Sequence, residues 1–424
     1  TNLSGKIFVD KIGPEEVIKL CANTLKAYDT RLVDHGNRVA YIADSLCRSM
    51  YKNNEIDEKA LLLLALFHDV GAYKTKEIER MVTFDCEDVF EHSLYGYLFL
   101  KYFSPLGDMG AVILNHHCSN DEYEKKDFEY KDYSNLIQIA DRVDIALGEG
   151  FSIQEIIQLI DNNKRFDQNQ VNAMKTLLED TDLCSQLESK QYVKKLQQLI
   201  LATNLTIEET SDFLRMMVYS IDFKSPTTVV HTIVTTRISL FLARALEFEE
   251  EEIGKVYIAS TVHDLGKIVI PEEILEKPGK LDFDQMEIMK KHVEYTEEII
   301  KGVLPDDVCK IAIRHHEKLD GSGYPHGIVD SDLSLSERVV AVADIVSALI
   351  SQRSYKEPFD KAKTLSIINQ MAQNNLIDSR VVNLVTEKYD EILDEIQLVT
   401  GPVIEKYHTI QQEYMEQIEK HKIE

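Results

Sequence analysis

The chain has 424 residues, and 44% of them are apolar, which is enough material for more than one hydrophobic core. Its 47 Lys and Arg stand against 73 Asp and Glu, and the formal charge of -26 repels phosphate backbones and anionic lipid headgroups. We therefore expect neither DNA nor RNA among its partners, and no membrane contact within this chain.

Further features of the sequence predict a cytoplasmic protein. The longest apolar run, residues 60–67, is too short to span a bilayer, and the N-terminus lacks a basic region followed by an apolar stretch. The chain begins with Thr1 and not Met, so we keep an upstream sensor among the candidate partners, together with a second copy of the chain. The cysteines are scattered without a CxxC pair, which predicts reduced thiols and no disulfide framework: Cys21, Cys47, Cys86, Cys118, Cys184 and Cys309.

Apolar residues recur at steps of three and four along almost every long segment, a pattern typical of amphipathic helices. Two examples are the segments 32–46 and 233–246. Alternating strand patterns are scarce, and only 17 Gly and 9 Pro interrupt the chain, which favours long helices joined by short loops. The sequence therefore predicts an all-α fold.

The histidines reveal an internal repeat when they are taken in chain order. Each half of the chain contains a single His, a His-Asp pair, another single His, a His-His pair and an Asp, in the same order. Successive landmarks are 33, 24, 24 and 24 residues apart in the first half and 32, 29, 23 and 28 apart in the second. The two sets are His35, His68, Asp69, His92, His116, His117 and Asp141, and His231, His263, Asp264, His292, His315, His316 and Asp344.

This repeat predicts two tandem copies of one helical domain. The first copy is expected to span residues 1–180 and the second copy residues 205–424. The segment between them, residues 181–204, contains the polar stretch 188–198, which is typical of a helical connector and not of a flexible linker.

The repeated residues are suited to binding metals. Imidazole and carboxylate together are typical ligands of divalent first-row metals, whereas all-oxygen sets suit magnesium or calcium. Five His and two Asp per copy are too many for one tetrahedral zinc ion and fit two metals that share a carboxylate, the arrangement used for in-line attack at phosphorus. Asp69 and Asp264 each follow a His at the end of an apolar helix, so each is the expected bridge.

The ordered ligand set resembles the HD superfamily of metal-dependent phosphohydrolases, and the second copy resembles the HD-GYP phosphodiesterases. Two segments carry the second resemblance: 263–267, which reads His-Asp-Leu-Gly-Lys, and 315–325, which reads His-His-Glu-Lys-Leu-Asp-Gly-Ser-Gly-Tyr-Pro. The match extends over residues 225–356. The first copy is similar to HD domains at its ligand positions but lacks Gly-Tyr-Pro.

The resemblance implies hydrolysis of a cyclic dinucleotide, with cyclic di-GMP as the expected substrate, at a centre of two iron or manganese ions. A hydroxide between the metals would attack phosphorus, because metal binding lowers the pKa of water to about 7. Asp264 and Lys267 are the expected catalytic residues. The resemblance implies one metal held by His231, His263, Asp264 and Asp344 and another held by Asp264, His292, His315 and His316.

The resemblance also implies a substrate-binding set in the second copy. Lys267, Arg353 and Lys356 occupy positions where the family contacts substrate phosphate, and their charge would stabilise phosphoryl oxygens in the transition state. Tyr324 is expected to line the dinucleotide pocket. In the first copy Ala72 replaces the lysine, and no Arg-x-x-Lys follows the last Asp. We therefore expect the first domain to bind metals and to be regulatory.

The number of metals is a separate expectation. Some family members hold a third metal with the help of a Glu four residues before the first His. Here those positions are Thr227 in the second copy and Arg31 in the first copy. We therefore expect two metals in each site.

Two alternatives stay open. In one, both HD domains bind metal or nucleotide and report to partners as a signalling scaffold without turnover, although the presence of Lys267 and Arg353 weighs against this. In the other, the chain performs a different HD chemistry, such as nucleotide phosphohydrolysis or di-iron oxygenation, which fits the first copy best.

Overall fold

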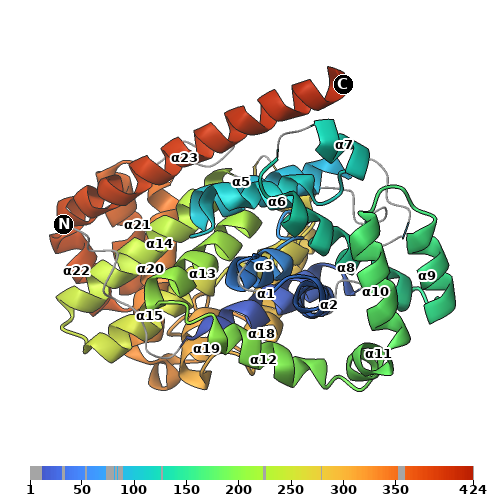
Figure 1. The fold of residues 1–424 in the computed structure, drawn as a ribbon. Helices are drawn as coiled ribbons and strands as arrows, with labels where there is room; N and C mark the ends of the chain where they lie inside the picture. The colour runs from blue at the N-terminus through green and yellow to red at the C-terminus, as the bar shows by residue number, and fades with distance from the viewer. Residues whose placement is uncertain are drawn as a thin grey trace. The chain divides into compact units, whose positions relative to one another are not determined.

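The computed structural model describes residues 12–30, 34–52, 55–72, 81, 84, 89–125, 128–222, 226–277, 279–351 and 359–423. These residues form helices and connecting turns without a β-strand (Figure 1). Two isolated β-bridges, Lys301 with Leu304 and Asp320 with Val329, are the extended pairings among them. The all-α fold predicted from the sequence is confirmed. None of the described helices combines the length and the hydropathy that crossing a bilayer requires.

The chain folds into two compact units. The N-terminal unit consists of Val17–Ser220 together with residues 412–423, and the C-terminal unit consists of Ile221–Gln411 together with residues 12–16. The expected connector, residues 181–204, is helical and lies within the N-terminal unit. The domain bounds at residues 180 and 205 stay a prediction.

The N-terminal unit is built around the longest apolar run of the sequence. Helix α3 is buried from Ala60 to Leu66, and the Asp57 side chain caps its start by accepting a hydrogen bond from Ala60 N at 3.1 Å. Helix α2 packs against both α3 and α8. The helices are α1 (Pro14–Tyr28), α2 (His35–Met50), α3 (Glu58–Leu66), α5 (Phe90–Phe103), η3 (Gly107–Gly110), α6 (Ala111–Asn115), α7 (Asn120–Lys125), α8 (Lys131–Gly148), α9 (Ile153–Asp161), α10 (Gln168–Glu179), α11 (Thr181–Glu188), α12 (Tyr192–Ala202) and α13 (Ile207–Asp222).

The C-terminal unit repeats this arrangement, with α14 packed against α15 and α20. Helix α20 starts with a capping box, in which the Ser334 hydroxyl accepts from Glu337 N and the Glu337 carboxylate accepts from Ser334 N. The helices are α14 (Pro226–Ala245), α15 (Glu250–Val262), η4 (Leu265–Val269), α16 (Glu272–Leu275), α17 (Phe283–Lys290), α18 (His292–Ile300), α19 (Asp306–Ile313), η5 (Asp330–Asp332), α20 (Leu335–Ile350), α21 (Lys361–Gln373), α22 (Ser379–Glu387) and α23 (Tyr389–Ile423).

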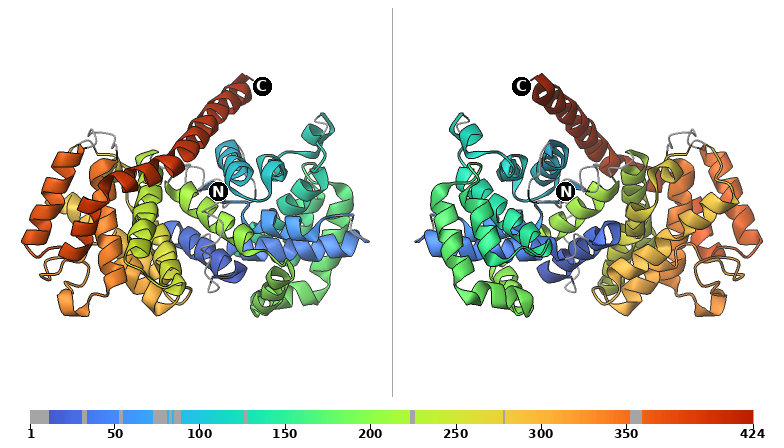
Figure 2. Two further views of the ribbon diagram at one scale, coloured as in Figure 1. Left: turned by 90° about the vertical axis from the view of Figure 1, so that its left-hand side faces the viewer. Right: turned by 90° about the vertical axis from the view of Figure 1, so that its right-hand side faces the viewer.

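The last helix, α23, is one long continuous helix (Figure 2). Its residues up to Gln411 belong to the C-terminal unit and residues 412–423 to the N-terminal unit. Near its start, Ile392 belongs to the hydrophobic core that α14, α20, α21 and α22 share. Its last turns pack on α5, where the Tyr414 ring stacks on the Tyr95 ring with centroids 4.3 Å apart. The Glu413 carboxylate accepts a hydrogen bond from Lys101 Nζ at 2.7 Å. The end of α23 is therefore part of the N-terminal unit.

Candidate metal centres

Each unit brings its repeated His and Asp residues together from five separate segments. The first His lies in one helix, the His-Asp pair follows the next helix, another His lies in the first turn of a further helix, the His-His pair follows a fourth helix, and the last Asp lies within a long helix. In the C-terminal unit these helices are α14, α15, α18, α19 and α20, and in the N-terminal unit they are α2, α3, α5, α6 and α8. The order predicted from the sequence therefore corresponds to a spatial arrangement.

A glycine after each His-Asp pair permits the close packing that forms the centre. A Cβ atom on Gly266 would lie 2.0 Å from the His292 carbonyl oxygen, and one on Gly71 would lie 2.2 Å from the His92 carbonyl oxygen. Such distances exclude any side chain. In the C-terminal unit, Thr296 Oγ1 accepts from Gly266 N at 2.9 Å and donates to the His263 carbonyl at 3.1 Å. The turn after the His-Asp pair is thus fixed directly on the helix that carries the next His.

Backbone carbonyls orient three imidazoles of the C-terminal centre. In each case Nδ1 donates to the carbonyl three residues earlier: His263 to Ser260 at 2.7 Å, His292 to Met289 at 2.6 Å and His315 to Ala312 at 2.6 Å. This hydrogen bond requires a proton on Nδ1, so in the neutral form of each ring the lone pair is on Nε2. The Nε2 atoms of all three rings are buried and make no hydrogen bond. Buried ring nitrogens with free lone pairs are what a metal requires.

The carboxylate of Asp264 lies between two groups of histidines. Its Oδ2 is 3.2 Å from His263 Nε2 and 3.7 Å from His231 Nε2. Its Oδ1 is 3.3 Å from His292 Nε2 and 4.0 Å from His315 Nε2, and this oxygen also makes no hydrogen bond. Each oxygen therefore faces a different group, as a bridging ligand requires.

The ligand atoms of the C-terminal unit form two clusters. Those of His231, His263 and Asp264 lie within 4.8 Å of one another, as do those of His292, His315 and His316. The remaining expected ligand, Asp344, has its Oδ1 2.9 Å from His231 Nε2 and its Oδ2 3.7 Å from His316 Nδ1. The residues present thus fit two metal ions. All seven ligands expected from the sequence are brought together here.

Burial and the charges of neighbouring groups together determine the protonation of these ligands. It lowers the pKa of His315 to about 3 and that of His292 to about 4, so both rings are neutral at pH 7 and able to bind metal. Burial also disfavours charged His263, but the Asp264 and Asp344 carboxylates outweigh it and raise the pKa of His263 to about 10. For Asp264, burial acts to raise the pKa, yet the charges of His263 and Lys267 hold it well below its usual range.

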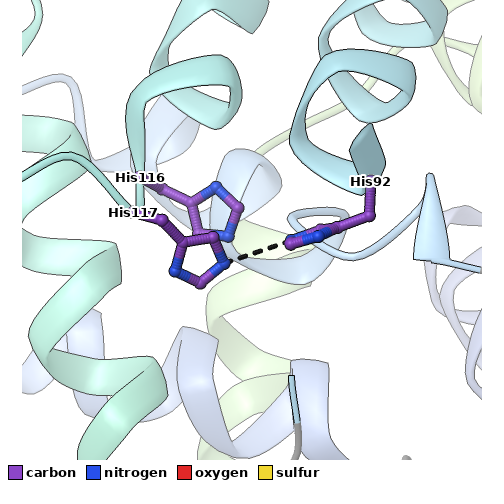
Figure 3. Close-up of side chains that lie close together, drawn as sticks. All are labelled: His92, His116 and His117. Carbon is purple, nitrogen blue, oxygen red and sulfur yellow. Dashed lines mark hydrogen bonds between the residues drawn. The ribbon is translucent and has the colours of Figure 1, made fainter. Parts of the chain in front are cut away.

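The N-terminal centre also has two clusters, although the carboxylate of its first cluster is Asp141, the equivalent of Asp344, and not the Asp of the His-Asp pair. The ligand atoms of His35, His68 and Asp141 lie within 4.8 Å of one another, as do those of the three remaining histidines, His92, His116 and His117. Figure 3 shows this second cluster, in which His92 Nε2 and His117 Nε2 are hydrogen bonded at 3.1 Å. Cys118, next to this cluster, contacts Asn115 Oδ1 at 3.5 Å and belongs to neither ligand group.

Orientation by backbone carbonyls recurs in the N-terminal centre. His68 Nδ1 donates to the Ala65 carbonyl at 2.8 Å and His116 Nδ1 to the Ile113 carbonyl at 2.5 Å, and the Nε2 atoms of both rings are buried without a hydrogen bond. Asp69, the expected bridge, has Oδ2 3.4 Å from His68 Nε2. The first-domain ligand set expected from the sequence is therefore also brought together.

The expected substrate residues are only partly described. Lys267 is half-buried, and its Nζ donates a hydrogen bond to the Asp264 carboxylate. The Tyr324 ring lies on the His316 ring with centroids 4.7 Å apart. Arg353 and Lys356 lie outside the described residues, as do Arg31 and the side chain of Thr227.

Sequence reasoning missed Glu317, which builds the loop that carries Tyr324. The Glu317 carboxylate is buried and accepts hydrogen bonds from His326 N at 2.8 Å and Ile328 N at 3.0 Å. Gly323 packs so closely on the same turn that a Cβ atom would lie 2.5 Å from Glu317 Cα. Its position directly after the His-His pair was the available signal, but an exposed glutamate would have had the same sequence context.

Lys318 is a second residue that sequence reasoning did not assign. Its side chain is half-buried, and burial lowers its pKa although the charge of Asp344 acts in the opposite direction. Lys318 interacts electrostatically with the expected ligand Asp344. It therefore adds positive charge beside the C-terminal centre. The only hint in the sequence was that a lysine lies inside the segment 315–325. Its spacing from the ligands does not distinguish it from an ordinary surface lysine.

Comparison with known proteins identifies the two units. The HD domain family matches residues 32–146 and, separately, residues 207–381. The chain contains two HD domains. The C-terminal HD domain is of the HD-GYP type, with Gly-Tyr-Pro at residues 323–325, whereas the N-terminal HD domain lacks this stretch. The resemblance predicted from the sequence is confirmed.

The relatives of the tandem HD protein are cyclic-dinucleotide phosphodiesterases. The 3'3'-cGAMP-specific phosphodiesterase 1 of Vibrio cholerae is 28% identical over 377 residues, which cover 83% of this chain and 86% of that protein. The cyclic di-GMP phosphodiesterase response regulator RpfG of Xanthomonas campestris is 36% identical over 198 residues, 46% of this chain and 52% of that protein. The chain thus spans about half the length of RpfG and most of the Vibrio protein.

A solved structure has the same fold. The crystal structure of the cyclic GMP-AMP specific phosphodiesterase V-cGAP3 of V. cholerae superimposes with a TM-score of 0.56 and covers 88% of this chain and 97% of that one. Its sequence is 19% identical, so this likeness concerns the fold alone.

Proposed function

We propose that the chain is a metal-dependent phosphodiesterase that hydrolyses a cyclic dinucleotide in its C-terminal HD-GYP domain. The observation that carries the proposal is the position of Asp264, whose two oxygens face two separate groups of buried imidazoles. The relatives support the substrate class, since they comprise enzymes for cyclic di-GMP and for 3'3'-cGAMP. Cyclic di-GMP, the substrate expected from the sequence, and 3'3'-cGAMP are both candidates.

The proposed ligands divide into two sets that share Asp264. One set is His231, His263, Asp264 and Asp344, and the other is Asp264, His292, His315 and His316. Iron or manganese is the expected metal, with two ions in each HD domain. When bound, the metals would supply Lewis-acid charge beside the scissile phosphate and lower the pKa of water.

The protein residues around this centre would bind and orient the dinucleotide. Lys267 is proposed to place its ammonium group beside a phosphoryl oxygen, because it is half-buried and already lies at the ligand carboxylate. Arg353 and Lys356 are proposed as further phosphate contacts. Tyr324, held against His316, would provide an aromatic surface for the dinucleotide.

The N-terminal HD domain is proposed to bind metals and to regulate, without turnover of its own. Ala72 stands where the C-terminal domain has Lys267. Among the described residues, Arg142 is a cation at its ligands: it is buried and donates from Nη2 to Asp141 Oδ2 at 2.5 Å. A cytoplasmic location, and a sensor or a second copy as partner, stay predictions.

The test is an assay of the purified chain, under reducing conditions and with its metals analysed, on cyclic di-GMP, 3'3'-cGAMP and simple nucleotides. We expect hydrolysis of a cyclic dinucleotide, loss of activity in Asp264→Ala and largely unchanged activity in the matched variant Asp69→Ala. Turnover in Asp264→Ala at the wild-type rate would contradict the metal assignment. Metal binding without hydrolysis of any cyclic dinucleotide would favour the scaffold or another HD chemistry.

A further inference from the structure

The Nδ1 atom of the first histidine has a different hydrogen-bond partner in each centre. His35 and His231 occupy equivalent places in the two ligand sets, and the partner of Nδ1 comes in both domains from three residues after the last ligand. In the N-terminal domain the partner is Asp144, and in the C-terminal domain it is Ser347. Both side chains are buried. The two centres therefore differ in the acceptor beside an otherwise matching ligand set: a buried carboxylate, itself paired with Arg38, in one and a buried hydroxyl in the other.

Asp144 offers an ionised acceptor to His35. Its Oδ2 is 2.7 Å from His35 Nδ1, and the carboxylate also accepts from Arg38, with Nε at 2.6 Å and Nη2 at 2.9 Å. Because an ionised carboxylate only accepts, Nδ1 of His35 carries a proton, and in the neutral ring that binds a metal the lone pair is on Nε2. That nitrogen faces the ligand carboxylates, 3.1 Å from Asp141 Oδ1 and 3.5 Å from Asp69 Oδ2.

Ser347 offers a neutral acceptor to His231. Its Oγ is 3.0 Å from His231 Nδ1 and donates its single proton to the His231 carbonyl at 3.1 Å. The hydroxyl therefore accepts from Nδ1 and fixes the same tautomer as in the N-terminal domain. Val234 stands where the N-terminal domain has Arg38, so the C-terminal domain lacks the arginine that holds the partner in place.

The difference between a carboxylate and a hydroxyl bears on metal binding. A hydrogen bond to an ionised acceptor is stronger than a neutral one, and a carboxylate behind a ligating imidazole fixes the ring and makes Nε2 a better electron donor. The ligand carboxylates carry matching cations, Arg142 on Asp141 and Lys267 on Asp264. Arg38 offsets part of the Asp144 charge, but the carboxylate still accepts the hydrogen bond from His35 Nδ1.

We propose that Asp144 is a positioning residue that makes the N-terminal centre bind its metals more tightly than the C-terminal centre. The inference rests on the proposed binding of metals in both domains, but not on catalysis in either. It assigns the two domains different behaviour at limiting metal: the N-terminal centre fills first, and the C-terminal centre responds to the free metal concentration.

The test measures the release of manganese from the loaded full-length chain to a chromogenic chelator. We expect a fast and a slow class of ions, with the slow class absent in Asp69→Ala and the fast class absent in Asp264→Ala. These two variants assign each class to its domain because each lacks the central carboxylate of one centre.

The decisive variant is Asp144→Ser, which gives His35 the partner that His231 has. We expect the affinity of the N-terminal centre for manganese to fall by about 10–100-fold, with the C-terminal ions unchanged in the same molecules. Asp144→Asn keeps a hydrogen-bond acceptor without the charge, so its N-terminal affinity for manganese is expected to lie between those of the wild type and Asp144→Ser. The matched control is Asp44→Ser, because Asp44 is also buried and paired with an arginine of its own helix, Arg48, but contacts no ligand.

The outcomes separate this inference from the proposed function. If Asp144→Ser releases its N-terminal ions like the wild type, or if Asp44→Ser weakens them equally, Asp144 has no positioning role. If the C-terminal centre retains its ions longer in the wild type, the proposed order is wrong. A chain that binds no manganese in either domain overturns both proposals. Normal release classes without hydrolysis of a cyclic dinucleotide leave this inference standing and overturn the proposed function.

Discussion

Lys267 donates a hydrogen bond from its ammonium group to the carboxylate of Asp264, three residues earlier in the chain. The cation proposed to bind substrate phosphate therefore contacts the ligand proposed to bridge the metals. The N-terminal domain has Ala72 in the corresponding position. The carboxylate of Asp69 therefore has no lysine three residues later in the chain.

Lys267→Met is expected to retain the metals and lose catalysis. The change removes a positive charge from the Asp264 carboxylate, so metal affinity should be equal or higher. Catalytic efficiency should fall by about 1.5–3 kcal/mol if one charged hydrogen bond to phosphate is lost. Elemental analysis and steady-state kinetics on the same samples check this, with the exposed Lys301→Met as control. Unchanged kinetics in a metal-loaded sample would remove Lys267 from the substrate site.

Glu317→Gln is expected to loosen the loop that holds Tyr324. The amide that replaces one carboxylate oxygen turns an acceptor into a donor that faces a backbone N–H. The loss of one charged hydrogen bond should lower the free energy of unfolding by about 1.5–3 kcal/mol, and the KM for the dinucleotide should rise more than kcat falls. Denaturant unfolding and kinetics measure the two effects. A stable variant with an unchanged KM would show that Glu317 does not position this loop.

Gly266→Ala is expected to destabilise the C-terminal domain and to disturb its centre. The added Cβ would lie 2.0 Å from the His292 carbonyl oxygen, and overpacking of this kind costs about 1–3 kcal/mol. Gly401→Ala is the matched control, because Gly401 lies within α23 with no atom within 4 Å of an added Cβ. The control should be neutral or stabilising by up to about 1 kcal/mol. Equal unfolding midpoints for the two variants would contradict the packing argument.

The metal-free protein is expected to lose stability as the pH falls from 6.5 to 4. Burial lowers the folded-state pKa of His292 to about 4 and that of His315 to about 3, whereas these side chains accept protons near pH 6.5 in the unfolded chain. The unfolded state therefore binds more protons in this window, and stability rises with pH. His263, whose pKa is raised to about 10, is protonated in both states below pH 6.5 and adds no slope there.

Urea unfolding of the chelator-treated chain at several pH values measures this dependence. Each of the two histidines should contribute a slope of at most about 1.4 kcal/mol per pH unit. His292→Asn should reduce the slope, whereas replacement of His408, which lies outside both ligand sets, should not. A stability that stays constant or rises as the pH falls would contradict the burial of neutral imidazoles.

The repeat predicted the location of both centres because the same order of helices places the ligands at equivalent positions, although their spacing along the chain differs. Fourteen His and Asp residues found from their order alone come together in two groups of seven. What the sequence did not reveal are side chains that act through a ligand and not on a metal. Asp144 and Ser347 differ in residue type, so the repeat conceals their common role, and the role of Glu317 depends on backbone N–H groups that carry no sequence signal.

Helix α23 determines which fragments of the chain contain a complete N-terminal unit. A fragment that ends near residue 220 would lack residues 412–423, and would expose the Tyr95 ring and the Lys101 ammonium group where Tyr414 and Glu413 now cover them. Expression of the N-terminal HD domain by simple truncation therefore removes part of its own folded surface. A faithful fragment needs the last turns of the chain as well, supplied in trans as a peptide or joined by a circular permutation.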